Sequence, residues 1–215
     1  MERTPCQRGA IDLLNAVYES GNLATGVAAT DMASGTGVYG APAAASITAK
    51  EYGFGNFRTT VLTCTATPVT ITDDAGVAQY GGVKIYDFPL GAICTMGGVI
   101  GGALTLGVTG TITDTWEGDV ALGTATATTG ATLTGTEADI VPSVAIAAAT
   151  KKVGTVKAVP VAAALTESGG RWLDGTTTAI DLYLNFVVDD HATHTAGTGT
   201  FTGTVTINWI YLGDH

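Results

Sequence analysis

The chain has 215 residues and a formal net charge of −10, with only nine Lys and Arg residues. Nucleic-acid phosphates are bound by stripes of cations, so this balance excludes direct nucleic-acid binding. Charged residues form 13% of the chain, about half of the roughly 25% typical of soluble proteins. So few charges favour a chain that buries large surfaces in an oligomer or on a partner. A soluble monomer covered with Thr, Gly and Ala is the alternative.

The first 52 residues are expected to form an N-terminal helix followed by an extended arm. Ile11, Leu14 and Tyr18 are spaced to form one apolar stripe, which is typical of an amphipathic helix. A frayed terminus is the alternative. Gly, Ala, Ser and Thr dominate residues 21–49, a composition typical of an arm that becomes ordered on binding. The N-terminus lacks the apolar run of a signal peptide, so we expect synthesis in the cytoplasm.

Residues 53–215 have the pattern of a β-domain. The chain contains 38 Thr residues, many of them at alternate positions in 109–115, 124–128 and 198–206. A period of two places successive side chains on opposite faces of a strand, and β-branched Thr suits a pleated surface. The sequence therefore predicts an all-β fold for this part of the chain.

The three Cys residues, Cys6, Cys64 and Cys94, show no paired spacing. An odd, unpaired set argues against a disulfide framework and favours folding in a reducing cytosol. Cys64 shares a predicted strand face with Leu62 and Ala66, which indicates a buried thiol.

Two glycine-rich stretches are predicted to interrupt strands. Gly81–Gly82 separates two short apolar runs and indicates a turn or a bulge. Residues 88–113 contain no charge, but Pro89 and several polar residues argue against a membrane-spanning helix. We expect two buried strands joined by a turn at Gly97–Gly102 instead. Pro142 predicts an edge strand or a break.

The last two predicted strands show the clearest alternation. Their apolar residues are Ile180, Leu182, Leu184, Phe186 and Val188 in the first, and Phe201, Val205, Ile207, Trp209 and Tyr211 in the second. Both strands are longer than the usual strand of about five to six residues. A pair of long strands that closes a series of shorter ones predicts a two-sheet antiparallel sandwich resembling a jelly roll.

Asp189, Asp190, His191 and His194 are the strongest candidates for a metal site, because two carboxylates and two imidazoles can ligate a divalent ion. The HxxH spacing lacks the register and the Glu of a zinc-protease helix, so a solvated loop is favoured. The sequence has no GxSxG motif and no Cys beside a His. We therefore predict a protein that is not an enzyme and that uses no cofactor.

Tyr52, Phe54 and Phe57 lie on a Gly-rich background, and we predict that they anchor the chain to a partner. The alternative is that they begin the core. Other aromatic residues are candidates for stacking on sugar rings, namely Trp116, Trp172 and Tyr183.

Six sequence segments resemble those of a known protein family: Gly53–Thr63, Gly82–Pro89, Thr115–Asp119, Leu173–Thr176, Ile180–Phe186 and Tyr211–Asp214. Together they resemble virion proteins of tailed bacteriophages, of the capsid-decorating or cement kind. The resemblance implies a β-sandwich, often a homotrimer, on the outside of the virion, made in the host cytoplasm. It also implies that the chain bridges major capsid proteins. From charge and hydropathy we expect neither a membrane nor a nucleic acid as a direct partner. The alternative is a virion or surface adhesin, or a fibre module, that binds a glycan or a host receptor.

Overall fold

The computed structural model describes residues 30–32, 40–54, 56–74, 78–106, 116–149, 156–164, 171–189 and 197–213. The predicted N-terminal helix, with its stripe of Ile11, Leu14 and Tyr18, lies outside these described residues, as does much of the predicted arm.

The described residues form twelve strands and one short 3-10 helix. The strands are β1 (Thr30–Met32), β2 (Ala41–Pro42), β3 (Ile47–Phe54), β4 (Phe57–Thr72), β5 (Gln79–Asp87), β6 (Gly91–Leu106), β7 (Trp116–Gly123), β8 (Val141–Ala149), β9 (Val156–Ala164), β10 (Arg171–Gly175), β11 (Asp181–Asp189) and β12 (Gly197–Gly213). The 3-10 helix η1 is Gly135–Glu137. The predicted boundary between arm and β-domain, at residues 52 and 53, falls inside β3.

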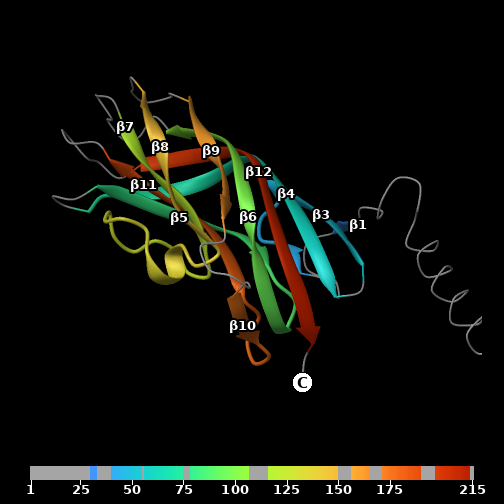
Figure 1. The fold of residues 1–215 in the computed structure, drawn as a ribbon. Coiled ribbons are helices and arrows are strands. Elements are labelled where there is room, and N and C mark those ends of the chain that lie inside the picture. Colours follow the sequence, from blue (N-terminus) through green and yellow to red (C-terminus); the bar gives the residue numbers. More distant parts are fainter. Residues whose placement is uncertain are drawn as a thin grey trace, which may run out of the picture.

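All strand pairs are antiparallel, which confirms the predicted all-β antiparallel class. Hydrogen bonds join the strands in the order β10-β6-β12-β4-β5-β11-β7-β8, with β3 beside β4 and β9 beside β6 (Figure 1). The predicted edge strand at Pro142 is confirmed, because β8 ends this order.

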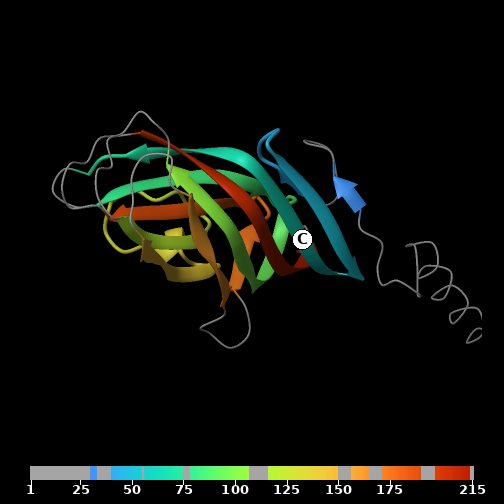
Figure 2. The same cartoon turned by 90° about the horizontal axis from the view of Figure 1, so that it is seen from above.

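The strands do not form the two separate sheets that the sequence predicted. They form one sheet that curls strongly into a half barrel (Figure 2). The long strand β4 makes this possible, because its first half pairs with β3 while Thr70–Thr72 pair with β5. The curl brings distant strands together across the core, where the rings of Phe186 in β11 and Phe201 in β12 lie 5.9 Å apart.

A bulge in β4 changes which side chains face the core. Ala66 has a φ of 49°, and its N–H donates a hydrogen bond of 3.0 Å to Thr202 Oγ1. Leu62 and Cys64 are buried before the bulge, as predicted, whereas Ala66 is exposed. The extra residue of the bulge shifts the alternation, so the core face continues at Thr67.

The predicted turn or bulge at Gly81–Gly82 and the predicted turn at Gly97–Gly102 are both wrong. Gly81–Gly82 lies inside β5 and pairs with β4 and with β11, and Gly97–Gly102 lies inside β6. A Cβ at Gly81 would lie 2.3 Å from the carbonyl oxygen of Thr70, and one at Gly82 would lie 2.4 Å from Asn185 Oδ1. These glycines therefore allow close approach between neighbours, which the sequence pattern did not separate from a turn.

The concave side of the sheet encloses the main core. In this core, the buried residues of β11 and β12 are ones predicted from their alternation, including Leu182, Leu184, Phe186, Phe201 and Trp209, whereas the predicted Ile180 and Tyr211 are only partly buried. β11 is buried on its other face as well, because the segment 124–140 (yellow in Figure 1) covers it. Val187 packs there in a second, smaller cluster with Ala121 and Leu133.

Candidate assembly surface

Four residues from four neighbouring strands form a row across the outer face of the sheet, which is the face turned away from the core. Phe57 of β4 is paired with Ile210 of β12, Ile210 with Cys94 of β6, and Cys94 with Trp172 of β10. The outer rings are the most exposed, with Phe57 at 60% and Trp172 at 62%. We call these four residues the aromatic row.

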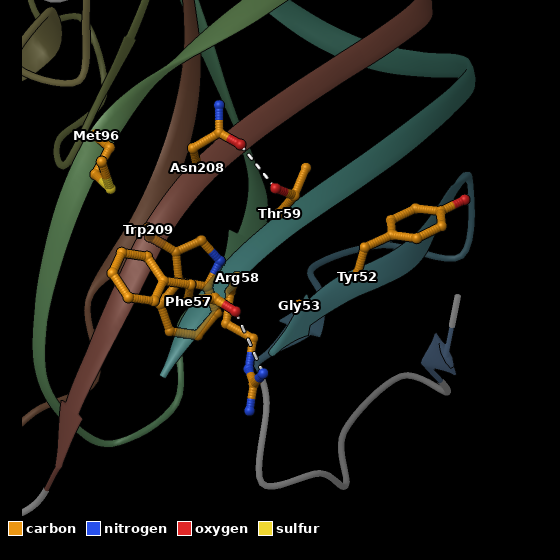
Figure 3. Close-up of a pocket in the computed structure, with 8 residues that line it drawn as sticks. All are labelled: Tyr52, Gly53, Phe57, Arg58, Thr59, Met96, Asn208 and Trp209. Carbon is orange, nitrogen blue, oxygen red and sulfur yellow. Dashed lines mark hydrogen bonds between the residues drawn. The ribbon is translucent and has the colours of Figure 1, made fainter. Parts of the chain in front are cut away.

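A second row lies beside the first on the same face. Tyr52 of β3 is paired with Thr59 of β4, which is paired with Asn208 of β12. The Thr59 hydroxyl donates a hydrogen bond of 2.8 Å to Asn208 Oδ1, and the exposed Met96 of β6 lies beyond it. The two rows border an open groove of about 380 Å³, lined by Tyr52, Gly53, Phe57, Arg58, Thr59, Met96, Asn208 and Trp209 (Figure 3).

Buried aromatic residues support the groove from the core side. Trp209 is fully buried, and its indole N–H donates a hydrogen bond of 2.9 Å to Thr60 Oγ1. Its ring meets that of Phe88 edge to face at 5.2 Å, and Phe88 meets Tyr86 in the same way at 5.2 Å. Such rings have few rotamers and hold the strands under the groove in place. The exposed side chains therefore project from a rigid base.

A buried ion pair lies under the same hairpin. Glu51 of β3 has only 4% of its side chain exposed, and its Oε1 lies 3.3 Å from Nε of Arg58 in β4. Burial raises the pKa of Glu51 to about 7, although the positive charge of Arg58 acts to lower it. Neither carboxylate oxygen has a hydrogen-bond partner within the described residues. The ion pair therefore offsets only part of the cost of burying this carboxylate.

Sequence reasoning missed this ion pair. The β3–β4 register places Glu51 opposite Thr60 and Arg58 opposite Gly53, so the two charged residues are diagonal neighbours on the core face. The ion pair could have been expected from the short connection between Phe54 and Phe57, because a short connection fixes the register of the two strands.

The structure brings two of the three predicted anchor residues to one surface. Tyr52 and Phe57 are both exposed there, and Phe54 is paired with Phe57 across the hairpin. Trp172, which was a candidate for stacking on sugars, lies in the aromatic row. Tyr183 is partly buried, and its hydroxyl donates a hydrogen bond of 3.2 Å to Asp181.

The predicted metal candidates are placed only in part. Asp189 is the last residue of β11, whereas Asp190, His191 and His194 lie outside the described residues. Elsewhere in the described chain, no three His, Cys, Asp or Glu side chains come together as metal ligands would. The same part of the chain contains no helix with the length and apolar character needed to span a membrane.

Comparison with known proteins gives few matches. No protein-family model and no curated protein matches the chain. Among solved structures, the chain is similar to one from the structure of infectious bursal disease virus Gx strain, with 14% identity and a TM-score of 0.31. The alignment covers 86% of this chain and 42% of the viral one, so this chain spans less than half the length of that protein.

Proposed function

We propose that this chain is a non-enzymatic structural protein of a virion, a cement or decoration subunit on the capsid exterior. It forms a homotrimer and stabilises the head by bridging neighbouring major capsid proteins. The observation that carries the proposal is the aromatic row beside the groove, an exposed apolar surface on a rigid sheet. The resemblance of six sequence segments in residues 53–215 to phage decoration proteins supports it.

The size of the row suits a contact that is repeated many times. Aromatic side chains bury roughly 150–250 Å² each, and Phe57 and Trp172 are 60% and 62% exposed. Covering both removes on the order of 250 Å² from water, about 6 kcal/mol gross at ~25 cal/mol per Å². Association costs consume part of this gain, but a symmetric shell repeats the contact at every copy.

Replacement of both aromatic residues tests the proposal. The double variant Phe57→Ala and Trp172→Ala should bind shells of the major capsid protein at least tenfold more weakly than the wild type in a co-sedimentation assay. Thr132→Ala, at an exposed position in the segment 124–140, is the control and should bind normally. Wild-type binding by the double variant, with its fold verified by circular dichroism, contradicts the proposed contact.

A second candidate function is an adhesin that binds a glycan, and the exposure of Trp172 is the observation that favours it. An exposed indole face can stack on a sugar ring. On a glycan array, this function predicts hits for the wild type that disappear for Trp172→Ala. An array without hits at high protein concentration argues against it.

A further inference from the structure

The three strands at the centre of the outer face are almost free of charge. β4, β6 and β12 have 16, 16 and 17 residues, and Arg58 is the single charged residue among them. Its side chain, 15% exposed, lies against the buried Glu51. Arg58 lines the groove at one end of this face, and beyond it no ionised group of these three strands projects from the outer face, although the whole chain carries a net charge of −10.

The outward positions of these strands carry mainly Thr and other small residues. Thr63 of β4 is paired with Thr204 of β12, and Thr204 with Gly101 of β6. In the next register, Val61 is paired with Thr206. The solvated face of an antiparallel sheet is normally polar, and here its polar groups are hydroxyls rather than charges. We call this surface, from Val61 to Thr70 on β4 with its neighbours on β12 and β6, the uncharged face.

We propose that the uncharged face is the surface through which copies of this chain associate with one another. The inference rests on the proposed function only for the number of copies, three. Because a surface that packs on its own counterpart closes a dimer, the uncharged face of each copy packs against a different surface of the next copy in the trimer. The surface itself follows from charge and from area.

Charge favours a second copy over a different partner. Each copy has a net charge of −10, so two copies repel one another wherever acidic faces meet. In the described strands other than β4, β6 and β12, acidic residues recur, as in Glu117, Asp119 and Asp174, whereas Asp87 and Asp181 share an ion pair with Lys84. A basic partner would gain most binding free energy by contacting those strands. Two identical acidic chains repel one another least when they meet at a face without ions.

The size of the face suits a contact between copies of this chain. The β12 residues opposite Val61–Thr70 run from Thr198 to Thr206, and at ~3.3 Å per residue they extend over roughly 30 Å. Three strands at about 4.8 Å spacing are roughly 14 Å wide, which gives an area on the order of 400 Å². A stable interface buries about 800 Å² on each partner, so the uncharged face forms the centre of such an interface and supplies about half of its area.

The test measures the mass of the purified full chain by sedimentation equilibrium, with no shell protein present. The wild type should have the mass of a trimer of the 21.6 kDa chain, and Thr204→Glu should sediment as a monomer at the same concentration. Thr132→Glu adds the same charge at an exposed position on another part of the chain, and it should remain a trimer. Thr63→Glu, on the neighbouring strand, replaces Thr204→Glu if circular dichroism shows that the latter does not fold.

A wild type that is monomeric at all concentrations, or a folded Thr204→Glu with the wild-type mass, overturns the inference. The two proposals fail separately. A trimer that does not bind shells contradicts the proposed function but supports the uncharged face as the interface between copies. A monomer that binds shells through Phe57 and Trp172 supports the proposed function but contradicts the interface.

Discussion

Asn185 is expected to be the most important polar side chain for stability. It lies in β11 and is fully buried. Its Oδ1 accepts a hydrogen bond of 2.9 Å from the Ala127 N–H. Its Nδ2 donates hydrogen bonds of 2.8 Å to the carbonyl oxygens of Ala125 and Glu137. One side chain thus holds both ends of the segment that covers the outer side of β11.

Asn185→Ala removes all three hydrogen bonds and leaves their backbone partners without them inside the protein. Each such bond contributes about 1 kcal/mol, and buried partners left unsatisfied add to the loss. We expect the free energy of unfolding to fall by about 3–4 kcal/mol, on the basis of these three bonds. Urea denaturation measures this as a lower midpoint with an unchanged slope.

Asn208→Ala is the matched control for this experiment. Asn208 is exposed and accepts a hydrogen bond of 2.8 Å from the Thr59 hydroxyl, so its loss should cost at most about 1 kcal/mol. If both variants lose the same stability, or if Asn185→Ala loses less than about 1 kcal/mol, the assigned role of Asn185 is refuted.

Two further predictions concern the same strands. Gly82→Ala places a Cβ 2.4 Å from both Asn185 Oδ1 and Thr126 Oγ1, so it should destabilise the fold by about 2 kcal/mol or more through overpacking. The control is Gly135→Ala, where a Cβ meets nothing within 4 Å and the positive φ should cost only about 1 kcal/mol. Equal losses of stability for the two variants in thermal denaturation contradict the close approach at Gly82. Glu51 has its pKa raised from 4.5 to about 7 in the folded protein, so the folded state retains a proton that the unfolded state loses. The stability of the wild type relative to Glu51→Gln should therefore be greatest below pH 4.5 and fall by about 3 kcal/mol as the pH rises to about 7. Parallel stability curves for the wild type and Glu51→Gln argue against a buried, protonated Glu51.

The sequence pattern predicted the strands with simple alternation and missed those with local irregularities. Trp209 and Phe201 are buried because a period of two holds along their faces, which is a local property. Ala66 was misplaced because one bulge residue reverses the alternation, and this bulge depends on the partner strand β12. Gly81–Gly82 was misread for a similar reason, since the close neighbours that require glycine come from distant residues.

The number of sheets and the assembly surface also depend on long-range pairing. β4 pairs with β12 along most of its length and, on its other edge, with β3 and then with β5. No local pattern shows that one strand connects both halves of a sheet. Tyr52 and Phe57 were predicted as surface anchors from their composition alone. Trp172 is distant in sequence, and only the register through β12 and β6 places it in the same row as Phe57.

The most direct test of the virion role is to fractionate the native source on a density gradient and to quantify this chain by mass spectrometry. A decoration subunit should co-sediment with the major capsid protein at hundreds of copies per particle. Recovery of the chain only in the soluble fraction, with none in the particle band, contradicts the proposed structural role.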